Sequence, residues 1–302
     1  MTEQEFNDPG REYRGVTLWM LNDRLEPEGI ARQTAGFREA GWGALIARTF
    51  TGLRTEYLSP AWHDSVRNII SEAAKNGLKT WLQAGYMPSA VPDLPEDEQH
   101  RVLVRRGDGN PPAAGETVLL ERDGVLYCEG RVSSVIDLLD DEACRKYLER
   151  AYTNTLEPQF GHEFGTTVEA IWVDEPHLQP PALTWSRRFP EQFERDWGYP
   201  IVEHIPSLFT REGDWRKVRH HYWRTVLRLL LESYFSRIGG WCTERNLKFS
   251  GHLMGEDTIR SQISWTAACM PGYEYMHLPG IDHLTKSLEW PANLPFVLPP
   301  LQ

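Results

Sequence analysis

The sequence predicts an α/β fold of the TIM-barrel type, (β/α)8-like but incomplete, with about six βα units. Three observations support this prediction. Short apolar, β-branched runs alternate with stretches of helical periodicity, which is typical of parallel strands joined by right-handed helical crossovers. The apolar runs open into polar or charged residues. The 302 residues also suffice for one large domain with a sizeable core.

The first three strand–helix units follow a polar lead-in of residues 1–14. Strands are predicted at Gly15–Leu21, Ala44–Phe50 and Lys79–Ala84, and helices at Pro27–Ala40 and from Ser59-Pro60 to Gly77. Serine followed by proline is typical of a helix start, because the serine side chain caps the first turn and proline lacks only an N–H that has no partner there. Gly41 and Gly77 are stop signals.

A β-rich insertion is expected after the third strand, over residues 88–137. It contains a Gly-Asp-Gly-Asn-Pro-Pro loop and two alternating runs, Thr117–Glu121 and Gly124–Cys128. Asp123-Gly124 between these runs favours a β-hairpin. We interpret the insertion either as a lid or substrate wall or as a decoration without function.

The second half of the chain returns to the alternating pattern up to about residue 284. Helices are predicted at Asp140–Phe160, Asp214–Asn246 and Thr258–Ala268, and strands at Val168–Val173, Lys248–Leu253 and Tyr273–His277. Gly239-Gly240 is expected to interrupt or bend the long helix. A proline-rich tail, residues 285–302, follows in place of a seventh helix. Three interpretations stay open: an incomplete barrel, a truncated chain, or an open sheet.

Composition restricts the classes of partner. The formal net charge of −11 argues against nucleic acid or an anionic membrane, because both would repel the chain. The four cysteines show no C-x-x-C spacing, which favours reduced, buried thiols over disulfides or a zinc site. There is no apolar signal segment and no run of membrane-spanning length. We therefore expect a cytoplasmic protein.

The candidate site begins at Asp174-Glu175-Pro176-His177, directly after the strand Val168–Val173. Carboxylates at the C-terminal end of a buried parallel strand lie where α/β barrels keep their chemistry. Other predicted strands and loops supply Asp23, Arg54, His252, Glu256, Asp257, Asp282 and His283. Several carboxylates and histidines in one pocket suit proton transfer at a glycosidic bond, which needs one protonated and one ionised carboxyl group.

The order of these motifs resembles the α-L-rhamnosidase-like glycoside hydrolases, a family with a (β/α)8 catalytic barrel. The resemblance covers about residues 15–284. The similar stretches are Trp19–Asp23, Gly52–Ser59, Asp174–His177, Gly251–Asp257, Tyr273–Met276 and Pro279–Leu284. It implies a barrel, a carbohydrate substrate of the α-L-rhamnoside type and a general acid at Glu175. It also implies that His252 and Glu256 contact the sugar or support residues that do.

The chain departs from this family in one respect. Family members carry a further glutamate in a Ser-Glu-Thr-Phe-Gly-like segment beyond the Pro-Gly-Ile-Asp-His motif, and no such segment is present. We therefore assign Glu175 and Glu256 as the catalytic pair, with Asp282 as the other candidate base. The predicted substrate-binding residues are Asp23, Arg54, Asp174, His177, His252, Asp257, Asp282 and His283.

Three alternatives accompany this assignment. The chain could bind a carbohydrate without hydrolysing it. Asp174, His177, His252 and Asp282 could instead hold a divalent cation such as calcium in a metal-dependent hydrolase, although no cofactor is assigned. A second copy or a partner chain could complete the barrel. Individual residues also have structural interpretations: Glu256 and Asp257 precede a predicted helix, where acids are stabilising, and the histidines could bond to the backbone in the core.

Overall fold

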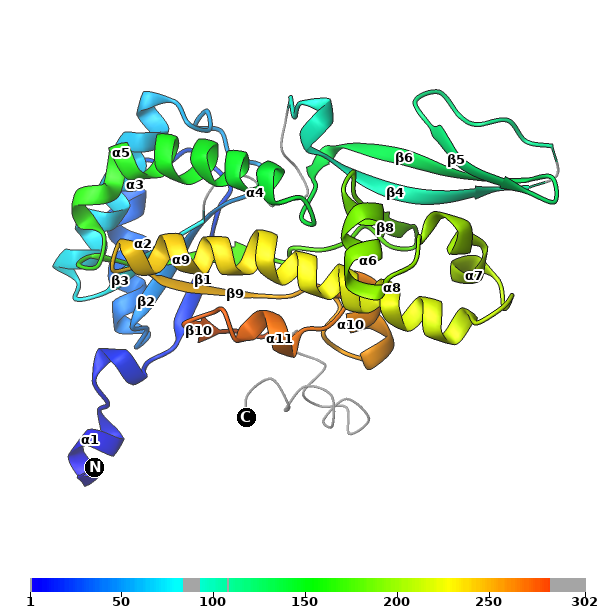
Figure 1. Cartoon of the computed structure of the whole chain (residues 1–302). Coiled ribbons are helices and arrows are strands. Elements are labelled where there is room, and N and C mark those ends of the chain that lie inside the picture. Colours follow the sequence, from blue (N-terminus) through cyan, green and yellow to red (C-terminus); the bar gives the residue numbers. More distant parts are fainter. Residues whose placement is uncertain (1, 84–92, 108, 283–302) are drawn as a thin grey trace. The chain divides into compact units, whose positions relative to one another are not determined.

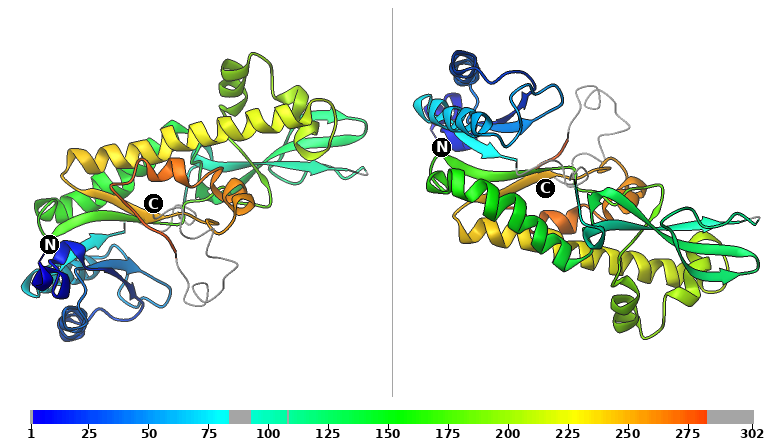
Figure 2. Two further views of the ribbon diagram at one scale, coloured as in Figure 1. Left: turned by 90° about the horizontal axis from the view of Figure 1, so that it is seen from below. Right: turned by 90° about the horizontal axis from the view of Figure 1, so that it is seen from above.

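The structure is a computed structural model that describes residues 2–83, 93–107 and 109–282. The chain divides into two compact units. The first comprises residues 1–86, 150–173 and 240–250, and the second comprises residues 87–149, 174–239 and 251–302. Figure 1 labels the elements, and Figure 2 shows them from two further sides. Each unit is described separately.

The first unit is built on a parallel sheet. Its strands, in sheet order, are β1 (Val16–Leu21), β2 (Ala44–Thr49), β3 (Lys79–Leu82), β7 (Val168–Asp174) and β9 (Lys248–His252). The last residue of β7 and the last two residues of β9 belong to the second unit. The pairs β1–β2, β2–β3 and β3–β7 are parallel. The helices are α1 (Glu3–Asn7), α2 (Pro27–Glu39), α3 (Pro60–Lys75) and α5 (Glu157–Phe160). The three predicted N-terminal strands and the two helices between them are thus observed.

Helix α3 illustrates how the sequence sets the boundaries of an element. The Ser59 side chain accepts a hydrogen bond from the Trp62 N–H at 3.2 Å, as a capping serine does. One face of α3 is buried, through Trp62, Val66, Ile69, Ile70 and Ala73, which is the spacing of an amphipathic helix. After Gly77, whose φ is +72°, the Leu78 N–H returns to the Ala73 carbonyl at 2.8 Å and ends the helix.

The second unit contains the predicted β-rich insertion as an antiparallel sheet. The strand order is β5 (Thr117–Arg122), β6 (Val125–Ile136), β4 (Gln99–Arg106) and β8 (Leu183–Trp185). The hairpin is where the Asp-Gly pattern predicts it, with Arg122 opposite Val125. Asp123 and Gly124 have φ values of +53° and +73°, the conformation that favours Asp-Gly in a two-residue hairpin loop.

The second unit also contains several helices. They are α4 (Asp141–Leu148), α6 (Phe189–Trp197), α7 (Ile205–Phe209), α8 (Trp215–Leu230), α10 (Ile259–Thr266) and α11 (Met270–Tyr273). Helix α8 continues through a π-helical turn, Leu231–Phe235, into α9 (Ser236–Glu244), which passes into the first unit. The long predicted helix is therefore present. Its irregularity lies at this turn, whereas Gly239 and Gly240 lie inside α9.

The predicted strand at Tyr273–His277 is wrong. Residues 270–273 form helix α11, and the short strand β10 is Leu278–Pro279. Pro271 occupies the first turn of α11, where proline is well tolerated. The buried Tyr273 ends that helix. The run Tyr273–His277, which was predicted to be a strand, therefore consists of the last residue of α11 and the loop that follows it.

Two further features of the chain bear on its class. The cysteines Cys128, Cys144, Cys242 and Cys269 are all buried and free, as predicted. In the part of the chain that the structure describes, no helix is long and apolar enough to cross a membrane. The protein is thus a mixed α/β molecule with one parallel and one antiparallel sheet, and the incomplete barrel stays a prediction.

Candidate active site

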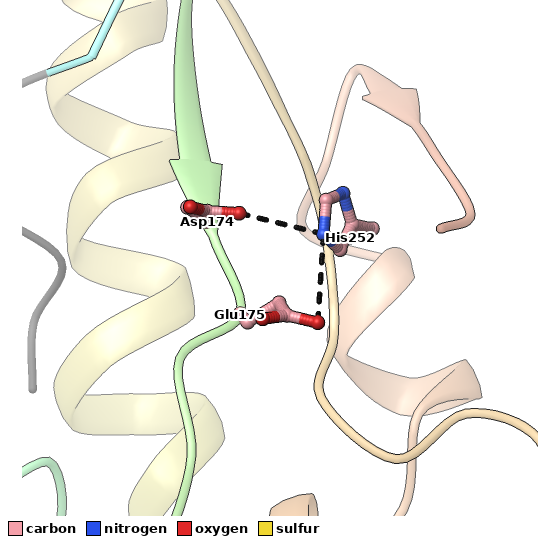
Figure 3. A group of neighbouring side chains, drawn as sticks. All are labelled: Asp174, Glu175 and His252. Atoms are coloured by element: carbon pink, nitrogen blue, oxygen red, sulfur yellow. Dashed lines mark ion pairs between the residues drawn. The ribbon is translucent and has the colours of Figure 1, made fainter. Parts of the chain in front are cut away.

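Asp174, Glu175 and His252 come together in the second unit (Figure 3). Asp174 ends β7 and His252 ends β9. The His252 Nε2 lies 3.5 Å from Asp174 Oδ1 and 3.9 Å from Glu175 Oε1. The Glu175 side chain is 23% exposed, whereas those of Asp174 and His252 are 4% and 12% exposed. Glu175 is therefore the member of this cluster most open to a ligand.

The backbone of Glu175 is held in an unusual conformation. Its φ is +47°, in the left-handed region that costs a non-glycine residue free energy and is found at functional sites. The His177 Nδ1–H donates to the Glu175 carbonyl at 2.6 Å. The Leu178 N–H donates to the Trp265 carbonyl at 2.8 Å. These two bonds fix the chain on the C-terminal side of Glu175.

Trp265, on α10, contacts the segments that carry both candidate catalytic glutamates. Its ring meets the His177 ring edge-on, with centroids 5.2 Å apart. Gly255, which precedes Glu256, has a φ of +75° and approaches so closely that an added Cβ would lie 2.3 Å from Trp265 Cδ1. A glycine is therefore required at position 255, both for its conformation and for this approach. Trp265 is a positioning residue for both segments.

Glu256 is a buried carboxyl group with both oxygens engaged. Its Oε2 accepts a hydrogen bond from the Tyr273 hydroxyl at 2.5 Å, and its Oε1 accepts one from the Asp282 N–H. Burial raises the pKa of Glu256 to about 7, and the nearby acidic side chains act in the same direction. Glu256 thus changes protonation near neutral pH. The sequence did not reveal Tyr273 as its partner, because the two residues lie 17 positions apart, and because the local pattern predicted Tyr273 in a strand rather than at the end of α11.

The remaining predicted site residues fall into three groups. Asp23 and Arg54 belong to the first unit and form an ion pair, with Oδ1 and Nε 3.3 Å apart and both side chains about 70% exposed. Asp257 is exposed, and the cap of α10 is the next residue, Thr258, whose hydroxyl accepts from the Ser261 N–H. His283 lies outside the described residues.

The predicted metal set differs from the set that the structure brings together. Among the described residues, the donors that could hold one ion are Asp174, Glu175 and His252, whose ligand atoms lie within 4.8 Å of one another. His177 uses Nδ1 for the Glu175 carbonyl. One imidazole and two carboxylates suit a transition metal such as zinc. Calcium takes six to eight oxygen ligands, so this donor set does not fit the calcium expectation.

Comparisons with known proteins address the fold. No family model matches the sequence, and no protein of curated function matches it significantly. The structure is similar to that of a rhamnosidase from Novosphingobium sp. PP1Y, with a TM-score of 0.65 and 13% identity over 91% of this chain and 48% of the rhamnosidase. It is also similar to a β-galactosidase from the psychrophilic Marinomonas ef1, with a TM-score of 0.54 and 12% identity over 89% of this chain and 40% of that enzyme.

The protein has a glycoside hydrolase-like fold. At such low identity the similarity shows the fold alone, and the structural neighbours are TIM-barrel enzymes. The predicted mixed α/β class is confirmed, whereas the incomplete barrel and membership of the rhamnosidase-like family stay predictions. The chain spans about half the length of the rhamnosidase and less than half that of the β-galactosidase.

Proposed function

We propose that the protein hydrolyses a glycosidic bond of a carbohydrate, with an α-L-rhamnoside as the expected type of substrate. One observation carries this proposal. On a glycoside hydrolase-like fold, Asp174, Glu175 and His252 meet where β7 and β9 end, and strand ends are where barrel enzymes perform chemistry.

Glu175 is the general acid in this proposal. Its side chain is the most exposed of the three, and the bonds of the His177 side chain to the Glu175 carbonyl and of the Leu178 N–H to the Trp265 carbonyl fix the backbone that carries it. A general acid must hold a proton before the glycosidic oxygen receives it. The His252 Nε2 lies 3.5 Å from Asp174 Oδ1 and 3.9 Å from Glu175 Oε1, so a bridging water or a small approach of the side chains lets His252 exchange a proton with Glu175. Asp174 stabilises the charged imidazole when His252 holds that proton.

Glu256 is the proposed base. Each oxygen of a carboxylate has two lone pairs, so the bonds from Tyr273 and Asp282 leave acceptor capacity for a water molecule. A base must be ionised, and the pKa of Glu256 is raised to about 7. The ionised form therefore predominates above neutral pH, where we expect base catalysis to operate.

The deciding experiment measures the hydrolysis of aryl α-L-rhamnosides and aryl β-D-galactosides by the wild-type protein and by Glu175→Gln. We expect kcat/KM for the preferred glycoside to fall about 100-fold to 10,000-fold in the variant, the usual contribution of a general acid. Glu203→Gln, an exposed glutamate of the same unit, is the matched control and should leave the rate unchanged. Equal rates in wild type and Glu175→Gln would contradict the role of Glu175.

A metal-dependent hydrolase is the second candidate, because three donor atoms within 4.8 Å could hold an ion. A divalent ion at Asp174, Glu175 and His252 would acidify a bound water. This candidate predicts that a chelator abolishes hydrolysis and that zinc restores it. The acid–base proposal predicts a rate that a chelator does not change, so adding a chelator to the same assay separates the two.

A further inference from the structure

A cavity in the second unit lies outside the proposed active site. Its volume is about 450 Å³, within the range of small-molecule binding sites. The lining residues come from the end of β5, from α7 and the segments on either side of it, and from the start of α8. They are Arg122, Tyr199, His204, Ser207, Glu212, Gly213, Asp214, Lys217 and Val218. None of them belongs to the Glu175 cluster or contacts Glu256.

The charged groups of this cavity are balanced. Arg122 and Lys217 are hydrogen-bond donors, and Glu212 and Asp214 are acceptors. Within the described residues, no ion pair engages these four side chains, and all four are exposed. The Lys217 Nζ lies over the Tyr199 ring, 5.6 Å from its centroid. A single anion or cation would meet repulsion from one pair. An uncharged ligand whose groups both donate and accept hydrogen bonds would be matched by all four.

The aromatic side chains that line the cavity, Tyr199 and His204, are supported by contacts with neighbouring aromatic residues. The Tyr199 hydroxyl and His221 Nδ1 are 3.0 Å apart, and the His221 ring stacks on Trp197 with centroids 3.6 Å apart. The Tyr199 ring also meets the His204 ring edge-on at 5.0 Å. The Ser207 hydroxyl donates to the Glu212 carbonyl at 3.0 Å and fixes the loop before α8. Such a wall is preorganised, which lowers the entropic cost of binding.

We propose that this cavity is a second saccharide-binding site, specific for uncharged sugars. Sugar hydroxyls both donate and accept hydrogen bonds, and sugar rings present apolar C–H faces that pack on aromatic side chains. Arg122, Lys217, Glu212 and Asp214 bind the hydroxyls, and Tyr199 and His204 contact the ring. The choice of a saccharide over other polyols rests on the proposed function. The β-rich insertion contributes to this second site through Arg122.

The test is a calorimetric titration with two probes, methyl α-L-rhamnopyranoside and methyl β-D-galactopyranoside, in the Glu175→Gln background to prevent turnover. Lys217→Ala and Asp214→Ala should each raise Kd for the bound glycoside about tenfold, the effect of losing a hydrogen bond to a charged group. Arg216→Ala is the matched control, since Arg216 is an exposed cation of α8 that does not line the cavity. It should leave Kd unchanged. Thermal melting establishes that each variant is folded.

Three outcomes would overturn the proposal: no binding of either glycoside, an equal effect of Lys217→Ala and Arg216→Ala, or tighter binding of glucuronate than of the uncharged glycosides. The separate rate assay distinguishes this result from a failure of the proposed function. Lys217-dependent binding by a protein without turnover would support the second site and contradict the hydrolase proposal. Turnover without Lys217-dependent binding would support the hydrolase proposal and contradict the second site.

Discussion

At the scale of single residues, a second buried carboxyl group behaves like Glu256. Asp137 lies in the loop between β6 and α4, is 2% exposed and accepts the Leu139 N–H at 3.0 Å. Burial raises its pKa to about 7. Because the unfolded chain holds this proton less tightly, folding takes up a proton between about pH 4 and pH 7, and the free energy of unfolding falls as pH rises through this window. Above it, a buried charge opposes folding.

Asp137→Asn should remove the unfavourable free energy of burying the Asp137 charge at high pH. The amide oxygen can still accept from Leu139, and no charge is buried at high pH. We expect the difference in unfolding free energy between variant and wild type to grow in favour of the variant by about 2 kcal/mol from pH 5 to pH 8. Urea unfolding at several pH values measures it. Asp123→Asn, at the exposed hairpin turn, is the control. A constant difference across the pH range would show that Asp137 does not titrate with folding.

The residues of the site were predictable to different degrees. The sequence placed Asp174, Glu175 and His252 at strand ends, and the structure brings these three together. Trp265 and Tyr273 were missed as supporting residues. Both lie on short helices, α10 and α11, and meet residues of irregular segments, His177 and Glu256, where no periodicity indicates which side chains come together. Gly255, directly before Glu256, was the signal in the sequence that another residue approaches the backbone closely at this point, and that residue is Trp265.

At the scale of elements, helix α8 fixes the short edge strand of the antiparallel sheet. The buried Tyr222 donates its hydroxyl to the Thr184 carbonyl of β8 at 2.6 Å. Its ring also packs on Phe189 of α6, with centroids 5.3 Å apart. One side chain therefore joins two helices and a strand.

Tyr222→Phe tests the contribution of this hydrogen bond. The ring and its packing on Phe189 are kept, whereas the Thr184 carbonyl loses the hydrogen bond from the Tyr222 hydroxyl. We expect a loss of about 1 kcal/mol in the free energy of unfolding, typical for one buried hydrogen bond. Tyr275→Phe, at an exposed tyrosine, is the control and should leave the free energy of unfolding unchanged. Chemical denaturation with a common m-value gives both numbers, and equal midpoints for Tyr222→Phe and wild type would contradict the role of the bond.

The elements differ in how far the sequence predicts them. Strands β1, β2 and β3 are local apolar runs between strong turn signals, and the hairpin of β5 and β6 is set by Asp123-Gly124. Strands β4 and β8 were missed. β8 has three residues and pairs with β4, about 80 positions earlier in the chain. Such a strand owes its conformation to a distant partner, so a local pattern cannot indicate it.

At the scale of the whole molecule, all four thiols are protected. Burial raises the pKa of Cys242 and of Cys269 to about 12 and that of Cys144 well above its usual value. Since the thiolate is the reactive form, we expect no cysteine of the native protein to react with a thiol reagent at pH 8. All four should react in denaturant. A cysteine that reacts rapidly without denaturant would contradict the buried placement.

The distribution of the cysteines makes them reporters of cooperativity. Cys242 lies in the first unit, and Cys128, Cys144 and Cys269 lie in the second. Pulsed alkylation in low denaturant, read out residue by residue by mass spectrometry, therefore follows the opening of each unit separately. Identical labelling rates at Cys242 and the other three would mean that the chain unfolds as one cooperative block. A faster rate at Cys242 would mean that the parallel sheet opens while the unit that carries Glu175 stays closed.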